Sequence, residues 1–136
     1  MFNNIIVHVE GMPGLHFPPA DHDFQADGNL HWSLKDGPSY KGDPLGELRR
    51  SKLFGASRDR YAPGWEAGGL FADPKFVRFR GDWKAQNAYA LRKASPAIDA
   101  GVAIPPDWPD PLRANDRGRP DIGAIPFGCE PWKVGR

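Results

Sequence analysis

The chain has 136 residues, 26% of them charged, and a formal net charge of +1 at pH 7. This length suits one domain, and a charge so close to zero predicts neither a nucleic-acid nor a membrane partner. The five Trp and eight Phe supply the apolar surface that disordered chains lack, so we expect a folded chain. Cys129 is the only cysteine, which excludes an internal disulfide.

The first half of the chain predicts two short strands joined by a loop. Residues 3–11 (NNIIVHVEG) are β-branched and bounded by turn residues, which is typical of a strand. Residues 12–23 are interrupted by Gly and Pro and predict a loop. Residues 29–35 (NLHWSLK) predict a second strand, with Leu30, Trp32 and Leu34 on one face and His31 on the other.

One helix is predicted, and short extended segments follow it. Asp43 and Pro44 suit a helix N-cap and first turn, so the helix is expected to continue through residues 45–58. Residues 73–83 and 89–93 alternate well enough for extended segments, whereas turn residues dominate from Ala94 onward. These patterns predict a mostly β chain with one helix.

Three motifs occur in an order that resembles a known family. They are residues 45–76, residues 87–101 (NAYALRKASPAIDAG) and residues 115–128 (NDRGRPDIGAIPFG). Together they resemble the C-terminal end of right-handed parallel β-helix proteins of the pectate-lyase-like superfamily. The resemblance implies a mainly β fold: a short right-handed parallel β-helix segment of two to three coils, with one short α-helix and a loop-rich C-terminal cap. Residues 1–43 would then form the first coil or coils, 44–60 the helix and a loop, 61–127 the last coil and cap, and 128–136 a tail.

The same resemblance implies a link to carbohydrates. Its members include polysaccharide lyases, glycoside hydrolases, epimerases and phage-tail-type binding proteins. Their catalytic residues lie on central coils, which would precede Met1, so we expect a truncated β-helix domain of a carbohydrate-active protein without activity of its own. The alternatives are a small lyase or hydrolase acting on an acidic polysaccharide, and a protein–protein interaction module. Such proteins are usually exported, although the first ten residues do not resemble a signal peptide.

The expected partners are a poly- or oligosaccharide and a second copy of the chain. A stack of coils cut open exposes unpaired backbone groups at its first strand. Phe2, Ile5 and Val7 lie in that strand, so a homodimer through the N-terminal coil is predicted.

Candidate binding residues lie in the loops and on the second strand. Asp21, His22 and Asp23 are adjacent and could position a proton donor or bind a cation, with His31 joining them from the next coil. Trp65 and Trp108 flank turns and could stack on sugar rings, although a core-packing role is the alternative for each. No motif specific for a metal occurs, so no cofactor is expected, and a calcium ion has no motif to support it.

Other polar residues are given structural roles. Asp99 and Asp121 each stand two residues before a Gly, where a carboxylate can accept backbone N–H groups of the turn. Arg119, with Arg117, could pair with Asp99 and fasten the closing segment to the last strand. Basic and aromatic residues interleave over residues 75–84, which indicates either a solvated face or a surface for acidic polymers.

Overall fold

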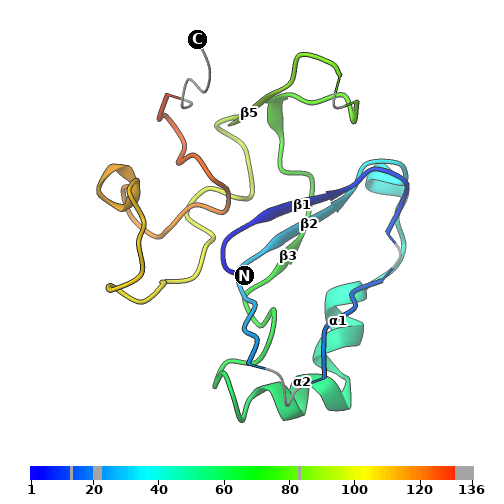
Figure 1. Cartoon of the computed structure of the whole chain (residues 1–136). Helices are drawn as coiled ribbons and strands as arrows, with labels where there is room; N and C mark the ends of the chain where they lie inside the picture. The colour runs from blue at the N-terminus through cyan, green and yellow to red at the C-terminus, as the bar shows by residue number, and fades with distance from the viewer. Residues whose placement is uncertain (13, 20–22, 83, 131–136) are drawn as a thin grey trace.

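The computed structural model describes residues 1–12, 14–19, 23–82 and 84–130 (Figure 1). A three-stranded sheet contains β1 (Ile5–His8), β2 (Leu30–Ser33) and β3 (Leu70–Phe71), and a two-stranded sheet contains β4 (Phe76–Arg78) and β5 (Ala88–Leu91). The helices are α1 (Pro44–Arg49) and α2 (Lys52–Ser57), with 3₁₀ turns at Gly37–Ser39 and Arg113–Asn115. Among the described residues, no helix has the length and apolar content needed to cross a bilayer.

The three-stranded sheet is parallel and in register. Ile5 lies opposite Leu30, which lies opposite Leu70, and the order across the sheet is β1-β2-β3. A side-chain ladder accompanies this register, because Asn4 donates through both its backbone N (2.9 Å) and its Nδ2 (3.0 Å) to Asn29 Oδ1. The predicted strands at residues 3–11 and 29–35 are therefore present, each in a shorter form.

The predicted fold class, a mainly β parallel β-helix of two to three coils, is wrong. Strands hold only 15% of the chain and helices 14%, and the described residues form no closed or solenoid sheet. The physical reason is local. Gly68 and Gly69 precede β3 and the Asp73-Pro74 pair follows it, so that strand is only two residues long. The second sheet is antiparallel and irregular between Phe76 and Arg78, and residues 98–130 are held mainly by turns.

The predicted helix divides into two. Its start is confirmed, because Asp43 caps α1 by accepting from Gly46 N at 2.9 Å and Pro44 occupies the first turn. Helix α1 ends at Arg49, and Ser51 then begins α2 by accepting from Phe54 N at 3.1 Å. A serine in the middle of the pattern competes for backbone N–H groups, which the apolar periodicity alone does not reveal.

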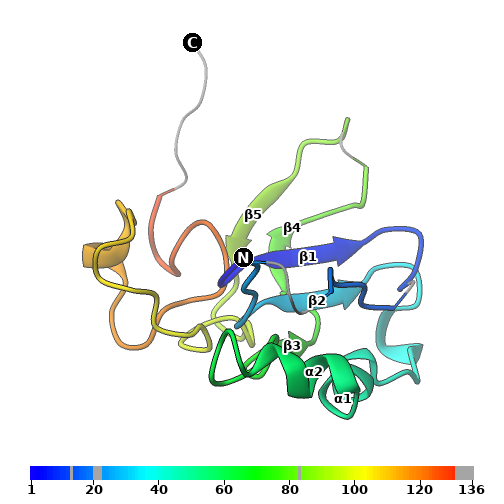
Figure 2. The ribbon, with the colours of Figure 1, turned by 60° about the horizontal axis from the view of Figure 1, so that its bottom comes forward.

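The apolar core lies on one face of the three-stranded sheet. Leu30, Leu91, Ala97 and Ile122 form its buried centre, and the partly buried Ile5 and Trp32 pack against it. Figure 2 shows β1 as the outer strand of the sheet, the helices beyond β3, and the β4–β5 hairpin rising past β1. The core therefore joins the sheet to the hairpin and to the C-terminal loops.

Asn3 fastens the start of the chain to the C-terminal loops. Its Nδ2 donates to Val102 O (2.8 Å) and its Oδ1 accepts from Val102 N (2.8 Å), although the two residues are 99 positions apart. Its backbone O also accepts from Gly123 N at 2.8 Å. Asn3 has a φ of +54°, a conformation that Asn tolerates better than most residues. Gly28 must lie close by, since a Cβ there would stand 2.5 Å from Asn3 Oδ1.

Candidate functional site

An open groove of about 890 Å³ lies between the N-terminal segment, the β4–β5 hairpin and the C-terminal loop. The two ribbon views place the C-terminal loop beside the start of β1 (Figures 1 and 2). The N-terminal side supplies Phe2 and Ile5, the hairpin supplies Tyr89, and the loop supplies Trp108 and Ile125. We call this feature the β1 groove.

Two aromatic rings of the β1 groove are open to solvent. Tyr89 is 53% exposed and Trp108 is 43% exposed. Trp108 packs edge-on with Phe2 at 5.5 Å between ring centroids, and Phe2 in turn packs edge-on with Tyr61 at 5.7 Å. Tyr89 packs with Phe76 and Phe79, so each exposed ring is held on one side and its remaining surface is available to a ligand.

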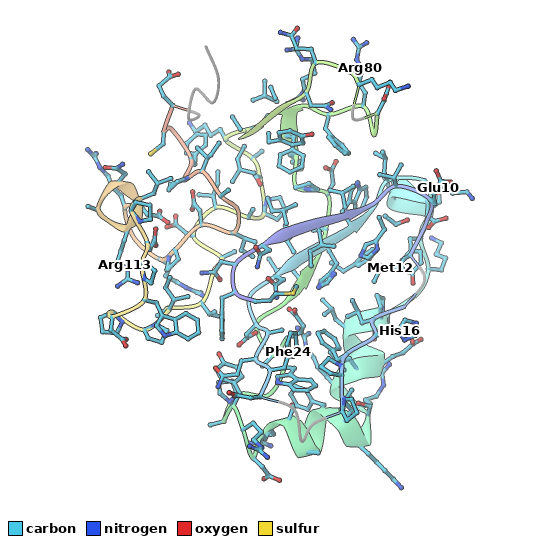
Figure 3. All side chains as sticks on the ribbon, in the orientation of Figure 1. Glu10, Met12, His16, Phe24, Arg80 and Arg113 are labelled. Atoms are coloured by element: carbon cyan, nitrogen blue, oxygen red, sulfur yellow. The ribbon has the colours of Figure 1, made fainter. Side chains whose placement is uncertain are left out.

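Arg113 holds the loop that carries Trp108. Its Nη2 donates to Pro105 O (2.9 Å) and Trp108 O (3.2 Å), and its Nη1 donates to Pro106 O (3.0 Å). One guanidinium thus closes the loop through three carbonyls, so the Trp108 ring is held in place before any ligand arrives. Figure 3 labels Arg113 on this loop.

The charge of the β1 groove is acidic. Asp110, Asp116 and Asp121 line it; Arg113 forms an ion pair with Asp110 at 3.8 Å, so the carboxylates of Asp116 and Asp121 remain without a cationic partner among the described residues. The Met1 ammonium, also at the groove, donates to Gln25 O at 2.6 Å. Burial raises the pKa of Asp116, and the neighbouring carboxylates raise it further. A cationic group entering the groove would relieve this repulsion.

The outer edge of β1 meets the β1 groove at Ile5 and continues beyond the groove to Val7. Leu30 N donates to Asn4 O (2.8 Å) and Leu34 N to His8 O (3.0 Å), so the even-numbered residues of β1 bond to β2. In a parallel ladder, the N–H and C=O of the intervening residues Ile5 and Val7 point the other way. Within the described part of the chain β1 pairs with β2 alone, so no second strand bonds to those four groups. The sheet therefore ends in an unpaired edge, and Ile5 opens into the groove.

A second cluster of polar side chains is buried at β2. Glu66 is fully buried, and its carboxylate accepts from Asn29 Nδ2 (2.5 Å) and Asn29 N (3.3 Å). His31 is 2% exposed, and its Nε2 stands 3.7 Å from Glu66 Oε1. His8 stacks on His31 with ring centroids 5.9 Å apart, and Arg49 donates to the Glu66 carbonyl at 2.7 Å. The cluster ties β1, β2, α1 and the turn before β3 together.

His8 should make the fold less stable in acid. Burial, and secondarily the His31 ring beside it, lower the pKa of His8 from its ordinary 6.5. The unfolded chain therefore takes up a proton at His8 before the folded chain does, so stability is lost as the pH falls below about 6.5. The melting temperature of the wild type should drop more between about pH 7.5 and about pH 5.5 than that of His8→Gln. His16→Gln, at an exposed loop position, should follow the wild type; equal slopes for all three chains would contradict the prediction.

The structure brings few of the predicted binding residues together. Asp21 and His22 lie outside the described residues. Asp23 is exposed in its loop, whereas His31 is buried against Glu66, so no contact joins Asp23 to His31. His31 was expected to join the loop cluster from the next coil, but it is buried within β2. In the described ranges, no three His, Cys, Asp or Glu side chains are arranged to hold a metal ion.

The two predicted sugar-stacking tryptophans lie in different environments. Trp65 as a surface residue is a wrong prediction, because it is fully buried between Phe17 and Phe24 and its Nε1 donates to Phe24 O at 2.9 Å. The glycine-containing turns beside it suggested exposure, yet they fold it inward. Trp108 does lie at an open groove. Figure 3 shows Phe24 on the segment that returns toward β2.

The closing segment is fastened by Asp121 more than by Asp99. The Asp121 carboxylate accepts from Asp99 N (2.7 Å) and Phe127 N (2.6 Å), and it is 7% exposed. Asp99 supplies its backbone N–H at a φ of +53°, and its side chain is not bonded to Arg117 or Arg119. Arg119 instead donates to Gly101 O at 3.1 Å. Asp121 thus accepts backbone N–H groups as expected, whereas the pairing expected between Asp99 and Arg117 or Arg119 does not form among the described residues.

Comparisons with known proteins add no relative. No family model matches the chain, and neither the curated proteins nor the solved structures contain a match. The sequence signals that could have identified the β1 groove are the alternation of Ile5 and Val7 and the Trp108 loop, whose acidic neighbours are spread over residues 110–121.

Proposed function

We propose that this chain is a protein-interaction module that takes an extended segment of a partner into the β1 groove, alongside β1. The observation that carries the proposal is the unpaired backbone edge of β1, which meets an open groove at Ile5 and continues to Val7. An extended segment laid along that edge would satisfy these four backbone groups through main-chain hydrogen bonds. Sheet edges are used in this way by several peptide-recognition domains.

The lining of the β1 groove indicates what the segment carries. Phe2, Ile5 and Ile125 offer apolar contacts, and the exposed faces of Tyr89 and Trp108 add aromatic surface. The carboxylates at the groove favour lysine or arginine on the partner, since opposite charges steer association and set specificity. The favoured partner segment therefore alternates apolar and basic residues.

Replacing Val7 with Pro tests the role of the edge. Proline removes the outward N–H of Val7 but leaves the bonds of Ile6 and His8 to β2, because edge strands tolerate proline at such positions. We expect Val7→Pro to bind an alternating apolar–basic peptide at least about tenfold more weakly than Val7→Thr does. Titration followed by Trp fluorescence gives the affinity, and a melting curve shows that each variant is folded.

Amide exchange shows whether the peptide pairs as a strand. The amides of Ile5 and Val7 should become protected when the basic peptide is added, and a peptide with Glu in place of each basic residue should leave them unchanged. Peptide binding that leaves both amides unprotected, or equal affinity in the two Val7 variants, would refute strand pairing.

Oligosaccharide binding is the second candidate, favoured by the exposed rings of Tyr89 and Trp108 in the same groove. The carboxylates there oppose an acidic polysaccharide, so a neutral oligosaccharide is the ligand this candidate requires. The same titration includes neutral oligosaccharides as a separate arm. A sugar that binds wild type and Val7→Pro equally, but not Trp108→Ala, would favour this second function over the first.

A further inference from the structure

The chain carries a segment with the chemistry that the β1 groove favours. Residues 76–80 (FVRFR) include β4, and Val77, Arg78 and Arg80 are exposed while Phe76 and Phe79 pack with Tyr89. Val77 is 47% exposed. We call residues 76–80 the basic strand. Apolar and basic residues alternate along residues 77–80, so Arg78 and Arg80 lie on one face of the strand and Val77 on the other. Neither arginine forms an ion pair with a described residue.

Phe76 of the basic strand lines the β1 groove, but the cationic end of the strand lies away from the Trp108 loop. Figure 3 shows Arg80 at the outer end of the hairpin and Arg113 on the loop at the other side. The Asn87 side chain fixes the base of the hairpin tip, since its Oδ1 accepts from Arg80 N (3.2 Å) and its Nδ2 donates to Asp82 O (2.9 Å). A structured segment of this kind can be presented to another molecule with little ordering cost.

We propose that the occupant of the β1 groove is the basic strand of a second copy, so that copies join head to tail. The inference rests on the proposed interaction function and specifies the partner as a second copy of this chain. Its basis is charge complementarity between Arg78 and Arg80 on one copy and Asp110 and Asp116 on the next. Two different surfaces meet in such a contact, so each copy keeps one unused groove and one unused basic strand. The contact is heterologous and builds open chains of copies.

Two neutralising variants separate the two surfaces. The strand variant carries Arg78→Gln and Arg80→Gln. The groove variant carries Asp110→Asn and Asp116→Asn, whose amide oxygens can still accept from Leu112 N and Asp121 N as the carboxylates do. A control variant, Lys41→Gln with Lys52→Gln, removes two exposed cations elsewhere. All four chains are compared by sedimentation velocity over a range of concentrations and salt.

At low salt, the wild type and the control should show a mass that rises with concentration. In about 1 M salt the mass should fall toward that of the monomer, because charges more than about 3 Å apart are then largely screened. Each surface variant alone should associate at least about tenfold more weakly. A mixture of the two variants should give a complex of two copies and nothing larger, because the strand variant retains its groove and the groove variant retains its basic strand. Restored pairing in the mixture is the result that a merely destabilised surface would not give.

A wild type that stays monomeric at every concentration would overturn the proposal, as would a mixture that does not pair. The peptide titration distinguishes this failure from failure of the proposed function. If a basic peptide protects the Ile5 and Val7 amides while the chain stays monomeric, the groove binds a basic segment of another protein and self-association is rejected. If a neutral oligosaccharide alone binds, both proposals fail.

Discussion

Replacing Asp121 with Ala is expected to lower the free energy of unfolding by about 2–4 kcal/mol, which is a large part of the stability of a small domain. The reason is that the Asp121 carboxylate serves two backbone donors at once, Asp99 N and Phe127 N. Alanine leaves both N–H groups without an acceptor where the chain is only partly open to water. Urea denaturation, with the slope compared between variants, measures the change.

Variants at Asp99 provide the matched control. Asp99 has a φ of +53°, and the exposed side chain has no recorded hydrogen bond to another described residue. Asp99→Gly should therefore lie within about 0.5 kcal/mol of wild type, while Asp99→Ala should lose about 1 kcal/mol through backbone strain. Asp121→Asn keeps one acceptor oxygen and should fall between wild type and Asp121→Ala. If Asp99→Gly cost as much as Asp121→Ala, the assignment of the fastening carboxylate would be wrong.

Trp65→Ala is expected to lower the free energy of unfolding by about 3–5 kcal/mol, the range for deleting a large buried aromatic side chain. The indole is fully buried, lies within 5.7 Å of both Phe17 and Phe24 between ring centroids, and donates to Phe24 O. Its removal opens a cavity under the loop between β1 and β2 and leaves that carbonyl without its donor.

Trp108→Ala tests the same side chain in the opposite environment. Trp108 is 43% exposed, and Arg113 holds its loop through backbone carbonyls. Replacing its side chain should therefore lower the free energy of unfolding by less than about 1 kcal/mol. Thermal denaturation of the two variants side by side would measure both changes. Equal losses would contradict the division into a core tryptophan and a groove tryptophan.

Local chemistry predicted the elements of this fold better than their assembly. The β-branched run at Ile5 and the alternation around Leu30 gave strands that are present, and Asp43 gave a correct helix start, because each signal acts within a few residues. The number of coils depends on whether successive segments stay extended long enough to pair. Two glycines and a proline around β3 decide that question, and their effect is visible only when the neighbouring strands are in place.

In the candidate site too, local features were predicted better than long-range contacts. Trp108 was named from its loop. Asp121 was named as an acceptor of backbone N–H groups, which it is, whereas Asp99, named for the same role, supplies an N–H to Asp121. Trp65 was misplaced, because flanking glycines say nothing about the direction in which a turn folds. The burial of His31 against Glu66 joins residues 35 positions apart, and no spacing rule connects a strand residue to a carboxylate in a distant turn.

The clamp between Asn3 and Val102 also sets the order of events during synthesis. Loop closure over about a hundred residues is entropically costly and slow, so this contact forms late in folding. While the ribosome is still making the second half of the chain, Asn3 lacks both Val102 and Gly123, the two residues that bond to it from the C-terminal loops. A nascent chain of this kind is vulnerable to mispairing until residue 102 has emerged, and a translational pause before that point would lengthen the exposure.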